Sequence, residues 1–287
     1  MTYAEWYQTY IQIYKRNLKP KTVESYDRLL GLMSPILGDV ALASITPELL
    51  QMAINQVEDA AGSRQAQLAF ALLRASLARA VRSRRLTSNP VDAIDKPAHH
   101  GERGRAIKGR DWQLLRPLIA EDVAFALAAF AGLRRGEVLA LTRADVDLQR
   151  GVLHVRRQLV RVRGQLIEQT PKSAAGLREV PITPELAPSL QAACRLLHPR
   201  ARLVQISPET LNHRWRRLQL EAGVAQPYRL HDLRHTCATR LIAAGCSLNI
   251  VQYVLGHSSY QLTADTYTHI DGGDAAAAVE KIASLMR

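Results

Sequence analysis

The sequence lacks the features of a secreted or membrane-bound protein. Cys194, Cys237 and Cys246 are an odd number with no C-x-x-C pair, which argues against disulfides and zinc ribbons and fits buried thiols in a reducing cytoplasm. The longest apolar run, residues 123–133, is closed by charged residues and is too short to span a bilayer. The N-terminus has neither the basic nor the apolar region of a secretory signal. We therefore expect a cytoplasmic protein with no membrane partner.

Negative charge is scarce relative to positive charge. The chain has 38 Lys and Arg but only 26 Asp and Glu, which gives a net charge of +12 and a pI of about 10.0. Such an excess favours a polyanionic partner, nucleic acid first and an acidic membrane second, although a basic protein without such a partner remains an alternative. Hydrophobic residues make up 47% of the chain, which is enough for a core and excludes a wholly disordered protein.

Helical patterns fill residues 1–87. The sequence Thr46-Pro47-Glu48 combines a capping residue, a proline at the first helical position and an acid in the first turn, which together predict a helix start. Residues 63–86 form the longest helical pattern. Residues 88–108 then carry two prolines, two glycines and scattered basic residues without a period, which predicts a basic interdomain linker.

Residues 109–287 have the pattern of a larger, mixed domain. Helices are predicted at about 109–118, 121–131 and 135–142, and again from residue 183 to a C-terminal tail helix. Between them, residues 151–170 alternate and contain a turn at Arg163-Gly164, and residues 177–182 form a third short strand. The predicted fold class is mainly α with a small β-sheet (α+β): an all-helical domain, a linker, and a mostly helical domain with a three-stranded antiparallel sheet.

The hexapeptide HDLRHT, residues 231–236, places two histidines and an arginine close together. On a helix, His231, Arg234 and His235 fall within one sector of about 100°. Two histidines at that spacing can bind zinc, but the guanidinium would repel a metal ion and the glutamate of a metalloprotease helix is missing. This stretch alone leaves a zinc site, an anion site and an ordinary surface cluster open.

Other segments of the second domain also contain groups able to meet a phosphate. Arg134 in AGLRRGEVLAL lies at a helix start, where backbone N–H groups and the helix dipole already favour an anion. Lys172 lies in a loop between two strands, His257 in LGHSS follows a helix-ending glycine, and Tyr267 in TADTYTHI lies on a short helix. Each of these residues, taken alone, also has an ordinary structural interpretation.

Taken together and in this order, the residues resemble the active site of the tyrosine recombinases, also called the phage integrase family. The series is Arg134, Lys172, His231, Arg234, His257 and Tyr267. Residues 20–46 are similar to the family's core-binding domain, and residues from about 106 onward to its catalytic domain. The resemblance implies a helical core-type DNA-binding domain at 1–87, a basic linker at 88–108, and a catalytic domain with a tail helix at 109–287.

The resemblance also implies how the site would cleave a phosphodiester. Tyr267 would be the nucleophile and would form a 3′-phosphotyrosine. Arg134 and Arg234 would clamp the two non-bridging oxygens, and Lys172 would be the general acid to the leaving 5′ oxygen. Because two guanidiniums would supply the positive charge, we expect neither a metal ion nor another cofactor.

The histidines and nearby carboxylates complete this interpretation. His231 would assist proton transfer at the tyrosine, and His257 would donate to a non-bridging oxygen. HDLRHT is then an anion site, in which His235 either supports the residues that meet the phosphate or only packs. Glu137 would orient the first arginine from one helical turn away, and Asp145 would belong to local structure rather than to a carboxylate pair.

The implied function is site-specific recombination of double-stranded DNA by a homotetramer on two DNA sites. An accessory DNA-bending or directionality protein is a further expected partner. The ten-residue interval from His257 to Tyr267 is similar to that of phage and mobile-element integrases, whereas Xer-type chromosome recombinases usually have one residue fewer. We therefore expect a mobile-element integrase, although no arm-binding domain precedes the core-binding region. The alternatives are an Xer-type resolution recombinase, a relaxing enzyme like the type IB topoisomerases, and a DNA-binding regulator without catalysis. The last is disfavoured because every catalytic position is filled.

Overall fold

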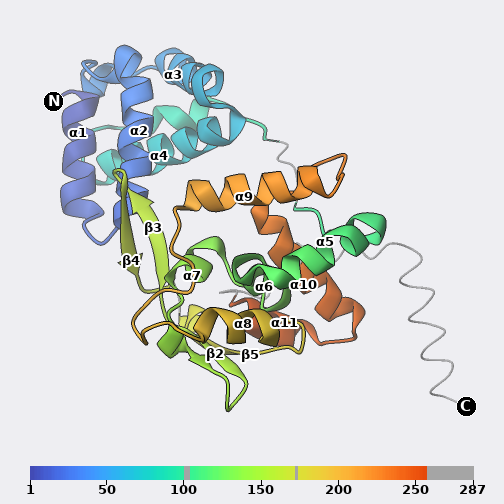
Figure 1. Ribbon diagram of the computed structural model, residues 1–287. Helices are drawn as coiled ribbons and strands as arrows, with labels where there is room; N and C mark the ends of the chain where they lie inside the picture. The colour runs from blue at the N-terminus through green and yellow to red at the C-terminus, as the bar shows by residue number, and fades with distance from the viewer. Residues whose placement is uncertain (100–103, 172–173, 257–287) are drawn as a thin grey trace, which may run out of the picture. The chain divides into compact units, whose positions relative to one another are not determined.

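The computed structural model describes residues 1–99, 104–171 and 174–256 (Figure 1). The chain divides into two compact units, Met1–Glu102 with Arg161–Gln165, and Arg103–Val160 with Leu166–Arg287. Each unit has its own buried hydrophobic cluster. In the part of the chain that the structure describes, no helix combines the length and the apolar character that crossing a bilayer requires.

The first unit is built from helices. They are α1 (Tyr3–Thr9), which continues into a π-helical turn (Tyr10–Tyr14), α2 (Pro20–Leu37), α3 (Pro47–Ala61) and α4 (Ser63–Arg82), with short 3₁₀ turns at Leu42–Ser44 and Pro90–Ala93. The predicted start of α3 is confirmed, because the Thr46 hydroxyl accepts a hydrogen bond from the backbone N–H of Leu49. The helical pattern predicted to residue 86 ends earlier, because Arg84 adopts a positive φ of 56°.

The core of this unit is aliphatic and aromatic. The side chains of Trp6, Tyr7 and Leu73 are among those with no exposed surface. Part of the segment predicted as a linker packs here as well, since Val91 is fully buried and the side-chain amide of Gln67 donates to the carbonyl oxygen of Pro97 at 2.9 Å. The chain therefore stays in contact with α3 and α4 well beyond the end of α4.

The second unit is mostly helical. Its helices are α5 (Gly109–Glu121), α6 (Val123–Phe130), α7 (Arg135–Ala140), α8 (Ala187–Cys194), α9 (Pro208–Glu221), α10 (Leu230–Ala243) and α11 (Leu248–Leu255). Helix α6 is apolar on every side, and it contacts α5, α7, α8 and α10, as its central place in the unit indicates (Figure 1). Phe125 of α6 packs against Trp215 of α9 with ring centroids 5.2 Å apart. A buried α6 thus supports the turn that follows it and the helix α10 beside it.

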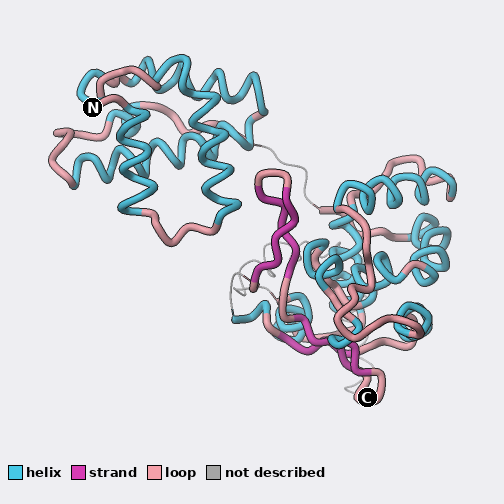
Figure 2. Tube along the Cα trace, turned by 60° about the vertical axis from the view of Figure 1, so that its left-hand side comes forward, coloured by secondary structure: helices cyan, strands magenta, loops and turns pink. Residues whose placement is uncertain are grey.

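The predicted three-stranded antiparallel sheet is present, but its strands differ from those expected. Its order is β1 (Val146–Asp147), β2 (Val152–Val155) and β5 (Arg178–Pro181), while β3 (Gln158–Val162) and β4 (Gln165–Gln169) form a separate hairpin (Figure 2). The predicted turn is confirmed, since Arg163 and Gly164 both have positive φ, as a tight hairpin turn requires. The interpretation of residues 151–170 as two strands was wrong. The alternation stops at Arg157, whose guanidinium donates to the buried carboxylate of Asp145 at 3.0 Å.

Candidate active site

The turn between α6 and α7 places Arg134 at the start of α7. The turn depends on Gly132, which has a φ of 65° and lies so near Leu255 that an added Cβ would come within 2.7 Å of that side chain. The backbone N–H of Arg134 donates to Glu137 Oε2 and its Nη1 donates to Glu137 Oε1, both at 2.9 Å. The expected contact between Glu137 and Arg134 is therefore confirmed, and it fixes both the backbone and the guanidinium of the arginine.

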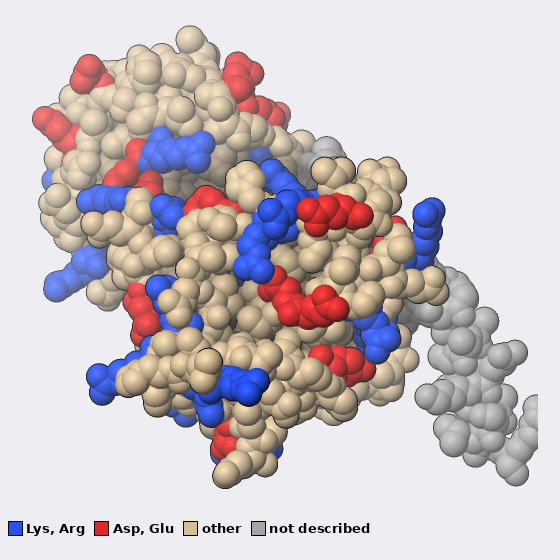
Figure 3. Space-filling model, viewed as in Figure 1, with Lys and Arg blue, Asp and Glu red and all other residues tan. Residues whose placement is uncertain are grey.

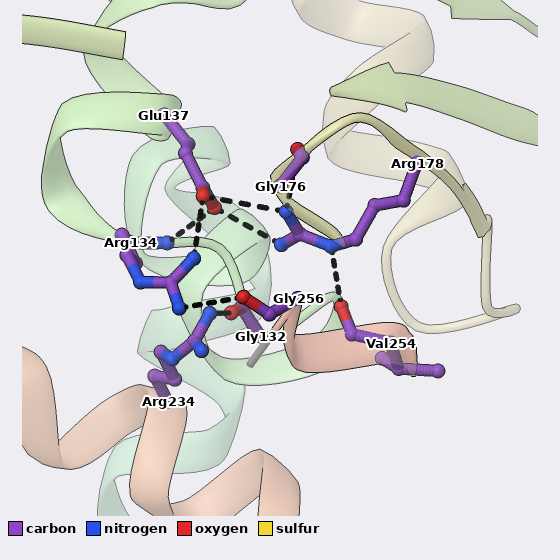
Figure 4. A network of polar contacts seen from close by, with 8 residues as sticks. All are labelled: Gly132, Arg134, Glu137, Gly176, Arg178, Arg234, Val254 and Gly256. Atoms are coloured by element: carbon purple, nitrogen blue, oxygen red, sulfur yellow. Dashed lines mark hydrogen bonds and ion pairs between the residues drawn. The ribbon is translucent and has the colours of Figure 1, made fainter. Parts of the chain in front are cut away.

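A second arginine, Arg178, binds the same carboxylate and was missed by the sequence analysis. From the start of β5 its Nη2 donates to Glu137 Oε2 at 3.0 Å, and its Nε donates to the carbonyl oxygen of Val254 at 2.7 Å (Figure 4). The side chains of Arg178 and Glu137 are only 1% and 2% exposed. A sequence signal was available: Arg178 has the same strand parity as Val180 and Ile182, so a charged residue occupied an inward-facing position.

Glu137 is ionised in this network. Burial by itself would raise the pKa of its carboxyl group, but the charge and hydrogen bonds of Arg178, followed by those of Arg134, outweigh burial and lower the pKa below its ordinary value. One carboxylate therefore accepts hydrogen bonds from two guanidiniums. With Arg234 the cluster contains three guanidiniums and one carboxylate, an excess of positive charge that suits an anion.

Arg234 reaches this cluster from α10. It is 2% exposed, and its Nη1 donates to the carbonyl oxygen of Gly132 at 2.6 Å, while Nη2 of Arg134 donates to the carbonyl oxygen of Gly256 at 2.8 Å. Figure 4 shows the guanidiniums of Arg134 and Arg234 directed toward one another. The Arg134 side chain is 34% exposed. The two arginines that the sequence analysis selected are therefore brought together, one buried and one open to solvent.

His231 lies one helical turn before Arg234 on α10. Its side chain keeps an exposed face, although protein atoms surround much of the ring. This partial burial, followed by the charges of His235 and Arg234, lowers the pKa of His231 to about 4. The imidazole is consequently neutral at neutral pH and able to accept a proton.

Three of the selected residues, Lys172, His257 and Tyr267, lie outside the described residues. Their described neighbours contact one another. Gly256 has a φ of 64°, and an added Cβ would come within 2.8 Å of both the carbonyl oxygen of Ala175 and Nη1 of Arg178. The loop that follows Lys172 in sequence and the helix end that precedes His257 thus meet at Arg178.

The chemistry of these groups suits an anion better than a metal ion. Within residues 1–99, 104–171 and 174–256, no group of three or more His, Cys, Asp or Glu side chains is arranged to hold a metal. The two histidines of HDLRHT meet edge to face, with ring centroids 4.9 Å apart, and Arg234 lies between them in sequence on the same helix. A guanidinium at that position repels a divalent cation and attracts a phosphate.

Comparison with protein families gives two matches. Residues 118–273, more than half of the chain, match the phage integrase family, and residues 2–57 match the N-terminal SAM-like domain of phage integrases.

The curated relatives include tyrosine recombinases of the XerC type and a prophage integrase. A tyrosine recombinase XerC-like protein of Caldanaerobacter subterraneus subsp. tengcongensis is 32% identical over 191 residues, which is 56% of this chain and 48% of the relative, so the chain spans about half of that protein. A prophage phiRv2 integrase of Mycobacterium tuberculosis is 28% identical over 270 residues, covering 85% of this chain and 69% of the relative. The tyrosine recombinase XerC of Alcanivorax borkumensis is 27% identical over 271 residues, 90% and 86% of the two chains.

Solved structures share the fold. The Tn1549 transposon integrase, in complex with a circular intermediate DNA, superposes with a TM-score of 0.81 at 21% identity and covers 98% of this chain and 99% of its own. A lambda integrase tetramer bound to a Holliday junction has a TM-score of 0.69 at 20% identity, with 93% and 77% covered.

Proposed function

The chain belongs to the phage integrase family, and on that premise we propose that it is a site-specific DNA recombinase that works through a 3′-phosphotyrosine intermediate. The observation that supports this most is the pair of guanidiniums, Arg134 and Arg234, directed toward one another. Two planar, permanently charged donors suit the two non-bridging oxygens of one phosphodiester. The buried pair of Glu137 and Arg178 holds the exposed member of the clamp in place.

In the proposed reaction the tyrosine oxygen attacks the scissile phosphorus. The phenolic proton of Tyr267 passes to the neutral ring of His231, and a bond forms between the tyrosine oxygen and phosphorus. The bond from phosphorus to the 5′ oxygen breaks, and that oxygen takes a proton from Lys172. In the second step a 5′ hydroxyl of another strand attacks the phosphotyrosine and these transfers run in reverse. The energy of the broken bond is retained, so no external energy source is needed.

The two arginines stabilise the negative charge that develops on the non-bridging oxygens. Arg134, Arg234 and His257 donate to these oxygens. The two guanidiniums are preorganised, because they already bind backbone carbonyls and Glu137. His231 gains a proton next to a phosphate that carries negative charge, which raises its pKa from the low value of the free protein. The bound phosphate therefore makes His231 a better base than it is in the free protein, whereas the two arginines by themselves lower its pKa.

The proposed partner is double-stranded DNA, bound by a homotetramer on two sites. The net charge of +12 supports a polyanionic partner, although on the face of Figure 3 Lys and Arg are spread among Asp and Glu rather than gathered in one patch. The lambda integrase with the same fold was solved as a tetramer on a Holliday junction. We also propose an accessory DNA-bending or directionality protein as a further partner.

A mobile element is the favoured setting. The ten-residue interval between His257 and Tyr267, the prophage integrase relative and the fold of the Tn1549 transposon integrase support it. The XerC relatives support the second candidate, chromosome or plasmid resolution. The two settings differ in where the DNA is cut: at the ends of an element and its circular form, or at a fixed chromosomal site.

Covalent trapping tests the proposal and identifies the target sequence in the same experiment. The full chain is expressed in cells that carry its gene in the native context, DNA that stays attached after denaturation is sequenced, and the cut sites are rebuilt as duplexes. We expect discrete sites with a tyrosine at the 3′ phosphate and recombinant products from paired duplexes. Attachment at scattered positions with relaxation of supercoils, and no product from two duplexes, would favour the topoisomerase-like alternative.

Two tyrosine variants complete the test. Tyr260, three residues after His257, is a rival nucleophile. Tyr267→Phe should bind the rebuilt duplex as the wild type does and form no adduct, while Tyr260→Phe should still form it. An adduct with Tyr267→Phe and none with Tyr260→Phe would reverse the assignment of the nucleophile.

A further inference from the structure

The proposed reaction uses one face of the HDLRHT segment and leaves the other unexplained. His231 and Arg234 belong to the face that meets the anion site. Asp232 and Thr236 lie on an adjacent face of α10, and His235 lies between the two faces, because successive helical residues are about 100° apart. Asp232 and Thr236 are buried, at 1% and 0% exposure. Polar side chains buried in this way need partners.

Some of these partners lie on α10 and at its start, since Asp232 accepts from the backbone N–H of Arg229 and Thr236 donates to the carbonyl oxygen of Asp232. The others are the first described residues of the second unit. The backbone N–H of Arg105 donates to Asp232 Oδ1 at 3.3 Å, and that of Ile107 donates to Thr236 Oγ1 at 2.9 Å. The Arg105 side chain adds bonds to Gln226 and Pro227 in front of α10. Residues 104–107 are therefore tied to the catalytic helix at two backbone positions.

Beside these ties, Gly104 packs against His235. A Cβ added to Gly104 would come closer than 3.0 Å to three ring atoms of His235: Cδ2, Nε2 and Cε1. A side chain at residue 104 would therefore require the His235 ring to move.

The His235 ring also contacts His231. The two rings meet at 88° with centroids 4.9 Å apart, in an edge-to-face contact. Among the residues that the structure describes, the charged and titratable groups that act on His231 are His235, Arg234 and Asp232 on α10 and Arg134 at the start of α7. Of these, His235 is the one in ring contact with His231.

We propose that His235 is a positioning residue, seated by Gly104 and holding the ring of His231 where the reaction needs it. This rests on the proposed role of His231 as the proton acceptor. An exposed histidine rotates about two side-chain bonds, and the His235 ring limits that freedom through direct contact. Residue 104 thereby acts on the proton-transfer step through His235.

The first experiment needs no DNA. The full chain is labelled at histidine, the ring signal of His231 is assigned by its loss in His231→Gln, and its chemical shift is followed against pH. Gly104→Ala should displace the signal and its titration midpoint, because the new methyl group moves His235. His235→Ala should displace it as well. The double variant Gly104→Ala/His235→Ala should match His235→Ala alone, because the methyl group then has no ring to displace.

Gly31→Ala is the matched control. Gly31 lies in α2, and a Cβ there would meet nothing within 4 Å. It should leave the His231 signal unchanged although it adds the same group. A His231 signal unaffected by both Gly104→Ala and His235→Ala, or displaced equally by Gly104→Ala with and without His235, would overturn the proposal. Should Gly104→Ala fail to fold, His235→Ala and its conservative partner His235→Gln carry the same comparison.

The second experiment separates positioning from a general structural role. On rebuilt DNA sites, His235→Ala should slow single-turnover cleavage about tenfold or more while the Kd for DNA stays within about twofold, with partial rescue in His235→Gln. Equal losses in cleavage and DNA binding would indicate a structural residue and contradict the proposal. If the His231 signal responds as expected but the wild type forms no adduct on any DNA, the ring contact stands and the proposed recombinase function fails. The two failures are thus distinct.

Discussion

The interiors of the two units differ in what they bury. In the first unit, the described core is aliphatic and aromatic, and its one buried polar side chain among the described residues is Ser76. In the second unit the buried set includes Glu137, Asp145, Arg178 and Arg234. Burying charge is costly unless partners compensate for the lost water, so it is not what folding alone favours. The buried charges of Glu137, Arg178 and Arg234 therefore mark the place in the second unit where we propose that a phosphate binds.

The largest effect on stability should come from Arg178. Arg178→Met keeps the length of the side chain but leaves the Glu137 carboxylate, which is 2% exposed, without its main partner. Breaking a buried pair in this way should lower the free energy of unfolding by about 3–5 kcal/mol, measured by urea unfolding. Arg150→Ala is the control, because its partner Glu179 is exposed and the pair should contribute about 0–1 kcal/mol. Similar losses for the two variants would remove the contrast between the interiors.

Replacing Arg134 should affect cleavage strongly and stability only weakly. Its side chain is 34% exposed, so Arg134→Ala should unfold at a temperature nearer to that of the wild type than Arg178→Met. Cleavage should fall by about 10²–10³, as expected for the loss of a donor to a developing negative charge. Arg116→Ala, which removes an exposed pair with Glu185 on the same unit, should cleave normally. A drop in stability as large as that of Arg178→Met would show that Arg134 is structural.

Glu137 should make the stability of the second unit depend on pH. Its pKa is lowered in the folded state, so its contribution to stability is present above the ordinary glutamate value and is lost as the pH falls through the lowered one. Glu137→Gln should cost roughly 1–3 kcal/mol at neutral pH, and the difference from wild type should shrink in acid. Glu185→Gln, at an exposed position, is the control. A constant difference across the range would mean that the carboxylate charge is not what matters.

The smallest effect should be in the first unit. Ser76 shares a hydrogen bond with the Tyr3 hydroxyl at 3.3 Å, while the Trp6 indole donates to the backbone carbonyl of Ser76, which alanine retains. Ser76→Ala should therefore lower the free energy of unfolding by about 1 kcal/mol or less and leave cleavage unchanged. A loss approaching that of Arg178→Met would show that the first unit also depends on a buried polar group.

The sequence predicted the parts of this structure that depend on nearby residues. The start of α3 at Pro47 and the contact between Arg134 and Glu137 span three residues or fewer, so capping chemistry and helical spacing were sufficient. The turn at Arg163-Gly164 is local in the same way.

The parts that it missed depend on long-range partners. Arg178 reaches Glu137 across 41 positions, and Ile107 reaches Thr236 across 129. The end of β2 is set by Arg157, which turns to Asp145 rather than continuing the alternation. Such partners are set by the tertiary fold, and a strand parity that places arginine inward indicates only that some partner must exist.

If Arg134 and Arg234 neutralise charge on the non-bridging oxygens of one phosphate, a substrate with an uncharged phosphate should need them less. A methyl group replaces one non-bridging oxygen at the scissile position of a rebuilt site, and single-turnover cleavage is measured for the wild type and for Arg134→Ala on both substrates. With one charge removed, less positive charge is needed, so the defect of about 10²–10³ expected on the ordinary phosphodiester should shrink at least tenfold. The same defect on both substrates would contradict the clamp.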